Sequence, residues 1–159
     1  MPAVYFPVSI LQNGIKLTTE PPRGIKANLK RSFNDQLEAV HPQRQEIFHK
    51  LLWGLSYFHS IILERKKFGP LGWNISYDFN DSDLETSKTV IKMLLEQEAI
   101  PWEALLFVTG QINYGGRVTD DWDRRCLMTI LKKFLNPEIA DLNYRFCENQ
   151  KYSIPFFGT

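Results

Sequence analysis

Residues 46–79 have the sequence EIFHKLLWGLSYFHSIILERKKFGPLGWNISYDF, and the rest of the chain is expected to pack around them. The first part of this stretch carries apolar residues at spacings of three and four, and further apolar residues fill most of the opposite side. Only a narrow polar stripe interrupts them, formed by His49, Lys50, Ser56, Ser60 and Glu64. A helix that is apolar on nearly every face must be covered on nearly every face by other elements. Its length and the charges at both ends indicate a core helix rather than a membrane span.

We predict that this central helix runs from about residue 43 to about residue 67. Gly69 and Pro70 follow it, which is typical just beyond the C-terminus of a helix. An aromatic loop, residues 71–80, comes next. We expect four aromatic residues of the helix and the loop to be structural, namely Trp53, Phe58, Trp73 and Tyr77.

The composition is that of an ordinary globular protein. The chain has 159 residues, of which 43% are apolar and 23% charged, enough for one domain with a core. The formal net charge is +1, so no overall field attracts the chain to nucleic acid or to a membrane surface. We recognise no secretory signal at the start. Cys126 and Cys147 form no spacing motif, and we expect two reduced thiols, with a disulfide or a metal pair as the alternatives.

The segments before the central helix combine extended and helical patterns. Residues 4–11, VYFPVSIL, predict a short edge strand, and residues 15–20 predict a second, weaker extended piece. Pro21 and Pro22 then start a helix, because proline suits the first helical position. Its core face repeats once per turn and consists of Ile25, Leu29 and Phe33.

Two helices are predicted after the aromatic loop. Ser82 and Glu85 have the spacing of a capping box, which predicts a helix from residue 82 to about residue 97. Its buried face comprises Leu84, Val90, Ile91, Leu94 and Leu95. A short helix follows over residues 100–109, and Tyr114-Gly115-Gly116 predicts a turn after it.

The last clear helix is predicted over residues 120–135, with Thr119 as its cap. Acidic residues lie in its first turn and lysines in its last, so both ends complement the helix dipole. Its apolar side consists of Trp122, Leu127, Ile130, Leu131 and Phe134. From residue 138 onward no period is sustained, and we expect this aromatic tail to dock on this domain or on another one.

No motif in the sequence forms a complete active site. Gly110, Gly115 and Gly116 have the spacing of a phosphate-binding loop, but Arg117 stands where that loop needs Lys followed by Ser or Thr. The preferred interpretation is therefore a glycine turn between helices. We predict no catalytic residue in this chain.

The titratable residues also have structural explanations. His41, His49 and His59 lack the spacing of a zinc site, so no metal site is predicted. We expect His49 to be a solvated residue of the polar stripe and His59 to be a hydrogen-bonded, semi-buried structural residue.

Three aspartates and one arginine complete the candidates. Asp120, Asp121 and Asp123 cluster at a helix start, where helix capping and pairing with Arg117, Arg124 or Arg125 explain them. Arg23, at the start of the proline-initiated helix, is the weak candidate for cofactor binding, because an arginine there could contact a phosphate across a domain gap.

Three long motifs, in the same order, resemble dynein heavy chains: TTEPPRGIKANL (18–29), LLWGLSYFHSIILERKKFGPLGWNISYDFNDSDL (51–84) and IPWEALLFVTGQINYGGRVTDDWDRRCLMTIL (100–131). They resemble the lid, or small subdomain, of the sixth AAA+ module of that family. The resemblance covers nearly the whole chain. The segments GQINYGGRVTDDWDRR (110–125) and YSIPFFGT (152–159) are similar to axonemal heavy chains.

The resemblance implies a mainly α fold, a helical AAA+ lid-type bundle of about five helices with short extended segments at the N-terminus and an irregular C-terminal tail. Residues 1–17 would end the preceding AAA+ large subdomain, residues 18–137 would form the lid, and residues 138–159 would lead toward the C-terminal domain. The loop GPLGWNISYDF (69–79) is expected to fix the angle between two lid helices. Further structural residues are Gly115, Gly116, Arg117, Asp120 and Trp122.

The function implied by the resemblance is mechanical. In that family ATP is hydrolysed mainly at the first AAA+ module and the sixth binds no nucleotide, so ATP and Mg²⁺ belong to other modules and no cofactor is expected in this chain. The domain would be a non-catalytic module of a dynein motor ring that relays ATP-driven conformational change in microtubule-based movement of cilia or flagella.

The resemblance also implies partners and a location. The direct partners would be neighbouring AAA+ subdomains and the C-terminal region of the same heavy chain. Dynein intermediate chains, light chains and microtubules would be reached through the full-length protein, in the cytoplasm and the cytoskeleton of the axoneme of a cilium or flagellum. No nucleic acid and no membrane is expected as a partner.

Two alternatives are open. The domain could be a nucleotide-responsive AAA+ lid that uses Arg23 as a sensor, which calorimetric titration with ATP and ADP would reveal. It could instead be a free-standing helical protein-interaction domain, which would be stable in isolation and have one dominant partner.

Overall fold

The computed structural model describes residues 13–15, 22–34, 44–141 and 144–147. The predicted strand at 4–11, most of the extended piece at 15–20 and most of the C-terminal tail lie outside the described residues. The described residues form five α-helices: α2 (Ile25–Asn34), α3 (Gln45–Arg65), α4 (Asp81–Leu95), α5 (Trp102–Phe107) and α6 (Asp121–Lys132). The predicted mainly helical fold class is confirmed.

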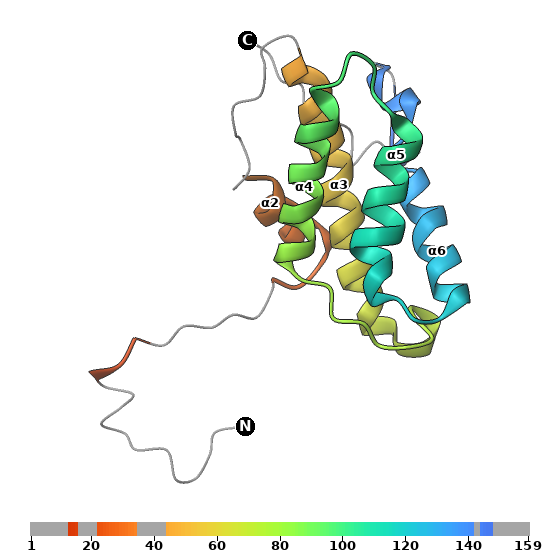
Figure 1. Cartoon of the computed structure of the whole chain (residues 1–159). Coiled ribbons are helices and arrows are strands. Elements are labelled where there is room, and N and C mark those ends of the chain that lie inside the picture. The colour runs from red at the N-terminus through yellow and green to blue at the C-terminus, as the bar shows by residue number, and fades with distance from the viewer. Residues whose placement is uncertain (1–12, 16–21, 35–43, 142–143, 148–159) are drawn as a thin grey trace, which may run out of the picture.

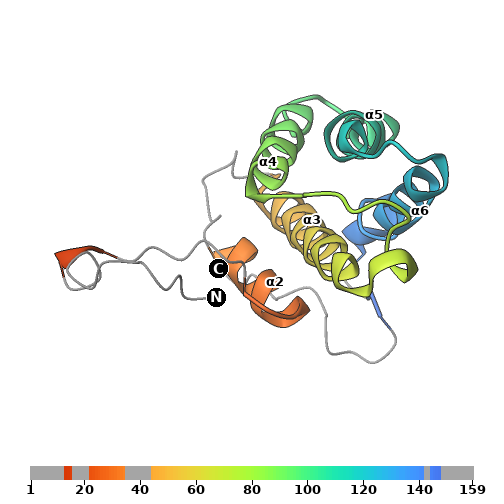
Figure 2. The ribbon, with the colours of Figure 1, turned by 90° about the horizontal axis from the view of Figure 1, so that it is seen from below.

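Helix α3 is the centre of the bundle, as predicted. Helix α2 packs on one side of it, and α4, α5 and α6 form an arc on the other side (Figure 2). Leu29 of α2 is buried against this core, and the ring of Phe33 packs edge-on against Trp53 of α3, with 4.9 Å between the ring centroids. The four helices α3 to α6 run roughly along one another, so the core lies between them (Figure 1).

The polar stripe of α3 is covered rather than solvated. Four of its five members are buried, namely His49, Lys50, Ser56 and Ser60, and Glu64 is partly exposed. The chain after α6 folds back over this side through the short 3₁₀ helix η5 (Pro137–Ala140), and Lys50 Nζ donates to the carbonyl oxygen of Ala140 at 3.1 Å. Lys50 also pairs with Glu46 at 2.8 Å. The prediction that His49 is solvated is therefore wrong, because only 7% of this residue is exposed in the folded bundle.

Beyond Arg65, α3 tightens into the 3₁₀ helix η2 (Lys66–Leu71) instead of ending in a simple stop. Gly69 has a φ of 53°, which favours glycine, and the chain changes direction there. The aromatic loop then crosses the end of the bundle. All three of its aromatic side chains are buried, namely Trp73, Tyr77 and Phe79.

The N-terminus of α4 is capped by Asn80, not by Ser82. Asn80 Oδ1 accepts hydrogen bonds from the backbone N–H groups of Ser82 at 3.1 Å and Asp83 at 3.3 Å. The Asp83 carboxylate accepts from the N–H of Asn80 at 2.9 Å, so a capping box exists two residues before the predicted one. Asn80 lies in extended backbone, which a cap residue needs, whereas Ser82 is already helical.

The predicted glycine turn at 114–116 is wrong. Helix α5 continues as a π-helix η3 (Val108–Tyr114) and a 3₁₀ helix η4 (Gly115–Arg117). Gly110 and Gly115 serve close packing, whereas a Cβ at Gly116 would meet no atom within 4 Å. A Cβ at Gly110 would lie 2.4 Å from Met128 Sδ, and a Cβ at Gly115 would lie 2.4 Å from the Gly110 carbonyl oxygen.

Helix α6 begins after Asp120, which caps it in place of the predicted Thr119 by accepting from the N–H of Asp123 at 2.9 Å. Leu127 and Leu131 are fully buried on its inner face. Trp122 is 69% exposed, so its predicted place on the apolar side is wrong. One residue turns the helix by about 100°, and Trp122 is one residue away from the inward positions spaced four apart.

The first part of the C-terminal tail docks on the core. The ring of Phe146 stacks on Phe134 with 5.3 Å between centroids and meets Tyr57 edge-on at 5.9 Å. The Tyr144 hydroxyl donates to the carbonyl oxygen of Lys133 at 2.7 Å. The expected docking on this domain is thus seen for residues 144–147, and the later aromatics of the tail lie outside the described residues.

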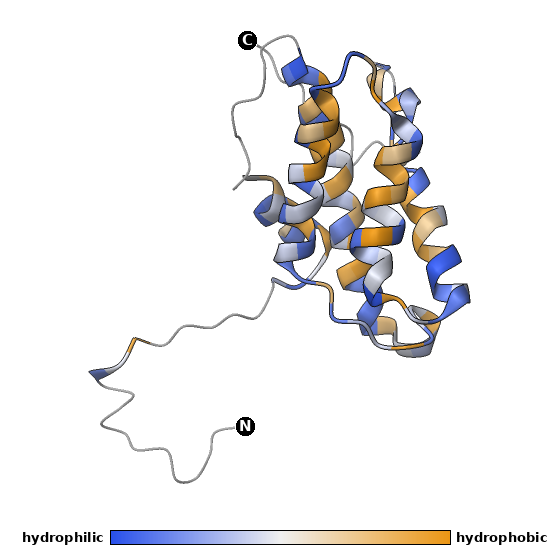
Figure 3. Ribbon diagram, in the orientation of Figure 1, coloured by the Kyte–Doolittle hydropathy of each residue, from blue (hydrophilic) through white to orange (hydrophobic). Residues whose placement is uncertain are grey.

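The distribution of apolar and hydrophilic residues agrees with this arrangement of the helices. Apolar residues line the facing sides of the helices, and the segment between α4 and α5 is mainly hydrophilic, whereas the segment between α3 and α4 is mixed (Figure 3). Among the residues that the structure describes, no helix has both the length and the hydropathy to cross a bilayer.

Candidate functional site

The candidate site is the junction at which the aromatic loop meets the first turn of α6, and Asp123 is its centre. Asp123 is only 5% exposed. Its carboxylate accepts hydrogen bonds from the backbone N–H groups of Asn74 at 3.0 Å and Ile75 at 3.2 Å, and from the Tyr77 hydroxyl at 3.0 Å. Charge-assisted hydrogen bonds of this kind are stronger than neutral ones. One buried carboxylate therefore joins two segments that are almost fifty residues apart in sequence.

Asp120 completes the junction from the other side. Besides capping α6, its carboxylate accepts from the side-chain amide of Asn74 at 3.1 Å. Its backbone N–H donates to the Tyr77 hydroxyl oxygen at 3.2 Å, while that hydroxyl donates to Asp123. The N–H of Asp123, and then the amide of Asn74, lower the pKa of Asp120, so it remains a carboxylate and an acceptor.

Trp73 fastens the loop to α3. Its Nε1 donates to the carbonyl oxygen of Ile62 at 3.3 Å, and its ring lies 5.9 Å from that of Tyr77, centroid to centroid. The guanidinium of Arg65 lies 5.1 Å from the Trp73 ring centroid and donates to the Gly72 carbonyl oxygen at 2.8 Å. The junction therefore connects three elements: the end of α3, the aromatic loop and α6.

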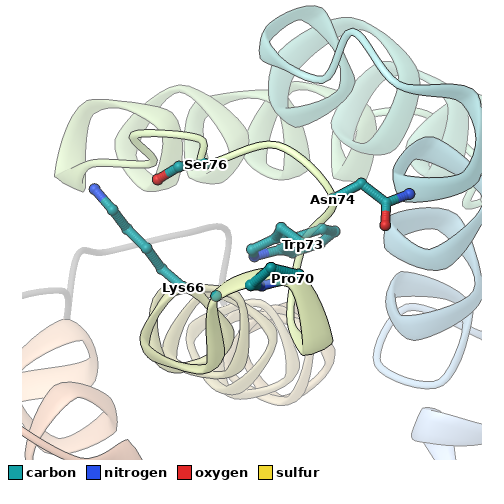
Figure 4. Close-up of a pocket in the computed structure, with 6 residues that line it drawn as sticks. Lys66, Pro70, Trp73, Asn74 and Ser76 are labelled. Atoms are coloured by element: carbon teal, nitrogen blue, oxygen red, sulfur yellow. The ribbon is translucent and has the colours of Figure 1, made fainter.

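A pocket of about 210 Å³ opens beside this junction. Trp73 and Pro70 lie next to each other along one side, and the Lys66 side chain reaches along another (Figure 4). Lys66 forms an ion pair with Asp78. Gly69, Asn74 and Ser76 complete the lining. The pocket offers an apolar wall and one cation that is already paired, so it has the surface of a contact site and not the groups of a catalytic centre.

A second buried network holds α3, α4 and the α5–η3 helix together. His59 Nδ1 and the Tyr114 hydroxyl lie 3.0 Å apart, and both side chains are fully buried. Burial lowers the pKa of His59 to about 4 and raises that of Tyr114 well above its usual value, so both are neutral at pH 7. The expectation that His59 is hydrogen-bonded is confirmed, whereas the expectation that it is only semi-buried is wrong.

Asp83 anchors this network at the start of α4. It is 5% exposed, and one carboxylate oxygen accepts from Arg117 Nε at 2.9 Å while the other accepts from the Asn80 N–H. The side-chain amide of Asn113 donates to the Asp83 carbonyl oxygen at 2.8 Å. Arg117 therefore pairs with Asp83, and the predicted pairing of Arg117 with the aspartates of α6 is wrong.

The neighbouring arginines of α6 make other contacts as well. Arg124 donates to the carbonyl oxygen of Val118 at 2.7 Å, and the guanidinium of Arg125 lies 5.1 Å from the ring centroid of Trp122. The acidic cluster is thus held mainly by capping and by the aromatic loop.

The structure gathers some predicted site residues and separates others. Trp73, Tyr77 and Asp120 meet at the junction. Trp53 lies at the α2–α3 contact, and Phe58 packs edge-on against Tyr114 in the core at 5.1 Å. These placements support structural roles, whereas Trp122 lies on the surface.

Groups for nucleotide or metal chemistry are not assembled among the described residues. Residues 110–117 are helical and pack against α6 instead of forming a loop that could surround a phosphate. Arg23 is exposed just before α2. Within the described ranges no group of three or more metal-ligating side chains comes together. Neither Cys126 nor Cys147 forms a disulfide bond.

Sequence reasoning missed the two buried carboxylates. Local patterns explain Asp123 only as one of three capping residues, and they do not distinguish Asp83 from its neighbours. A signal exists for both, because residues four apart share a helix face. Asp123 precedes Leu127 and Leu131 at this spacing, and Asp83 precedes the buried residues Ser87, Ile91 and Leu95.

Comparison with known proteins gives a consistent family assignment. The family model described as Dynein heavy chain AAA lid domain matches residues 48–159. The chain is 47% identical over 157 residues to human Dynein axonemal heavy chain 6, covering 98% of this chain and 4% of that protein. It is 49% identical over 164 residues to mouse Dynein axonemal heavy chain 3, covering 99% of this chain and 4% of that protein.

A rat relative, Dynein axonemal heavy chain 1, is 50% identical over 155 residues, which cover 96% of this chain and 3% of that protein. The chain thus spans only about one twenty-fifth of the length of these relatives. The match to the family model covers more than half of the chain, and the helical bundle agrees with it. The chain belongs to the dynein heavy chain AAA lid domain family.

Proposed function

We propose that this domain is a non-catalytic mechanical lid in the motor ring of an axonemal dynein heavy chain, in its sixth AAA+ module. It passes on movements that ATP hydrolysis starts in other modules, which hold the ATP and Mg²⁺. The observation that carries this proposal is the Asp123 junction, in which one buried carboxylate binds the aromatic loop to α6.

A relay must move as one body, because a displacement at one face has to reach the opposite face without being absorbed inside. Packed cores and fully bonded buried polar groups resist deformation. Asp123 fixes α6 to the aromatic loop, Trp73 fixes that loop to α3, and Asp83 fixes α4 to the helix that contains Arg117. These contacts favour a rigid lid whose conformational changes lie at its boundaries.

The proposed boundaries follow the sequence motifs. Residues 18–137 form the lid, residues 1–17 end the preceding large subdomain, and residues 138–159 lead toward the C-terminal domain. The packing of Tyr144 and Phe146 on the core supports a tail that leaves the lid from a fixed position. Conformational strain at the C-terminal side would then reach the bundle through Phe134.

The proposed surroundings are those of the whole motor. Neighbouring AAA+ subdomains and the C-terminal region of the same heavy chain contact the lid directly. The intact heavy chain brings the domain to dynein intermediate and light chains and to microtubules, in the axoneme of a cilium or flagellum. Similarity to three axonemal heavy chains supports this setting.

The test loosens the junction in a full-length heavy chain that contains this lid. Asp123→Ala should lower microtubule gliding velocity and microtubule-stimulated ATPase activity, while the affinity of the motor for ATP stays unchanged. The matched control is Asp121→Ala, because Asp121 lies in the same helical turn and is exposed. Unchanged gliding and ATPase activity in the Asp123 variant, with the lid measurably loosened, would exclude the relay.

A further inference from the structure

Helix α2 is attached to the bundle differently from the other helices. It packs on one side of α3, whereas α4, α5 and α6 lie on the opposite side (Figure 2). Among its described side chains one large apolar residue is buried, Leu29, while Ile25 and Phe33 are only partly buried. The lid family model matches residues 48–159, so α2 also lies outside the matched part of the chain. Both the packing and the family match therefore set α2 apart from the rest of the bundle.

The contact between α2 and α3 contains polar groups of both helices. Two further described residues of α2 are buried, and both are polar, namely Asn28 and Ser32. The side-chain amide of Asn28 donates to the carbonyl oxygen of Gly24 at 3.1 Å, which is a bond at the start of α2 itself. This bond needs no partner from α3, so it contributes nothing to holding α2 on the bundle.

Two buried polar groups lie unpaired on the side of α3 that faces α2. Trp53 packs against Phe33 of α2, and Ser56 lies one turn further along this side of α3. Neither Trp53 Nε1 nor Ser56 Oγ has a hydrogen-bond partner among the described residues. A buried polar group without a partner costs free energy, and water would bond it if α2 moved away. This gain offsets part of the packing that α2 loses when it leaves α3.

An exposed ion pair joins α2 to the start of α4. It is formed by Arg31 and Asp81, and both side chains are exposed. Exposed pairs contribute little to stability because water and salt screen them. The carboxylates that hold the other helices, Asp83 and Asp123, are instead buried and hydrogen-bonded to distant segments. Helix α2 is therefore held less firmly than α4 and α6.

We propose that α2 is a releasable strap, which leaves α3 during the motor cycle while α3 to α6 stay folded together. This inference rests on the proposed function, because it names the element at which the boundary of a rigid lid changes. The chain before α2 leads to the preceding large subdomain proposed above, so a movement of that subdomain reaches α2 before it reaches α3. Local opening of a weakly held element also needs less free energy than unfolding of the whole domain.

The test compares how often two buried positions become accessible in the full-length heavy chain. Leu29→Cys reports release of α2, and Leu105→Cys, on the buried face of α5, reports opening of the bundle. The two proteins are treated with N-ethylmaleimide, with and without ATP, and the labelled peptides are quantified by mass spectrometry. The thiol at position 29 should react roughly a hundredfold faster than the thiol at position 105, because local opening precedes global unfolding. ATP should change the rate at position 29 by at least about fivefold, the lower end of typical coupling between two sites.

A substitution at the contact should loosen the strap selectively. Phe33→Ala removes the ring that packs on Trp53, so it should raise the labelling rate of Leu29→Cys by roughly tenfold and leave that of Leu105→Cys unchanged. Lys30→Ala is the matched control, because Lys30 is an exposed residue of the same helix. It should change neither rate.

Equal labelling rates at positions 29 and 105, or a rate at position 29 that ATP does not change, would overturn the strap. Hydrogen exchange of the unsubstituted heavy chain detects the case in which a cysteine itself loosens the fold. Peptides from residues 22–34 should exchange faster than peptides from residues 45–65, and equal exchange would exclude release of α2. Normal gliding of the Asp123 variant beside ATP-dependent labelling of Leu29→Cys would overturn the relay and leave the strap.

Discussion

The carboxylate of Asp123 accepts a hydrogen bond from the Tyr77 hydroxyl at 3.0 Å inside the domain, although the two residues are 46 positions apart. The same hydroxyl accepts from the N–H of Asp120, so it is satisfied as donor and as acceptor. This pair converts a loop without regular secondary structure into a fixed part of the core. The consequences can be measured one residue at a time.

Asp123→Ala should lower the free energy of unfolding by about 2–4 kcal/mol, because two backbone N–H groups and a buried hydroxyl would lose their charged acceptor. Chemical denaturation of a heavy-chain fragment that contains the lid measures this. The control Asp121→Ala should change stability by less than about 1 kcal/mol, since that exposed side chain acts only on the helix dipole. Equal losses in both variants would contradict the role of the junction.

Trp73→Ala should cost about 3–5 kcal/mol, the usual range for removing a large buried aromatic side chain. Trp73 is 3% exposed and Trp122 is 69% exposed, so Trp122→Ala is the matched control. It should cost under about 1 kcal/mol, the strength of an exposed cation–π contact. A loss under about 1 kcal/mol for Trp73→Ala on chemical denaturation would show that the core lies elsewhere.

Gly54→Ala should destabilise the domain by about 1–3 kcal/mol through overpacking. A Cβ at Gly54 would lie 2.5 Å from the carbonyl oxygen of Phe134, and backbone cannot swing aside as a flexible side chain can. At Gly116 a Cβ would meet no atom within 4 Å. Gly116→Ala should therefore leave the thermal midpoint unchanged or slightly raised, and a fall as large as that of Gly54→Ala would refute the packing argument.

His59 should make stability depend on pH between about 4 and 6.5. Burial lowers its pKa from 6.5 to about 4 in the folded state, so the unfolded chain binds a proton over that window and the folded chain does not. Stability should be complete above pH 6.5 and fall by roughly 3 kcal/mol as the pH drops to 4.

The variant His59→Gln isolates this effect, because His49, whose pKa burial also lowers, titrates in both proteins. Urea titration from pH 4 to pH 7 measures the unfolding free energy of both proteins. The value for the wild-type protein minus the value for the variant should increase with pH. A difference that does not change with pH would place His59 in contact with solvent.

ATP and ADP should produce no binding heat with this domain in isothermal titration. Neighbouring atoms pack closely against Gly110 and Gly115, which leaves no loop for a phosphate. Arg23 by itself supplies only a single exposed positive charge. Binding at millimolar concentration or tighter, abolished by Arg23→Ala, would establish the alternative of a nucleotide-responsive lid. Lys26→Ala, in the first turn of α2, is the control for a nonspecific loss of positive charge.

Much of the architecture was predictable because burial leaves a periodic pattern. The spacing of apolar residues predicted four helices, α2, α3, α4 and α6, correctly to within a few residues. The caps were less predictable, since Asn80 and Ser82 are both good cap residues and only the backbone conformation distinguishes them. The glycine pair at 115–116 predicted a turn, because glycine is common in turns. Glycine also occurs inside a helix where another helix comes very close, as α6 does at Gly110.

The apolar pattern of residues 46–64 is enough to identify α3 as the central element, because a helix apolar on nearly every face is stable only when it is covered. The sequence also contains the motifs of the dynein heavy-chain lid. Which charges are internal depends instead on long-range contacts. Asp83, Lys50 and Asp123 are each placed by partners between 34 and 90 positions away. Local periodicity shows that a residue faces inward, and only the folded chain shows which distant N–H or carbonyl group meets it there.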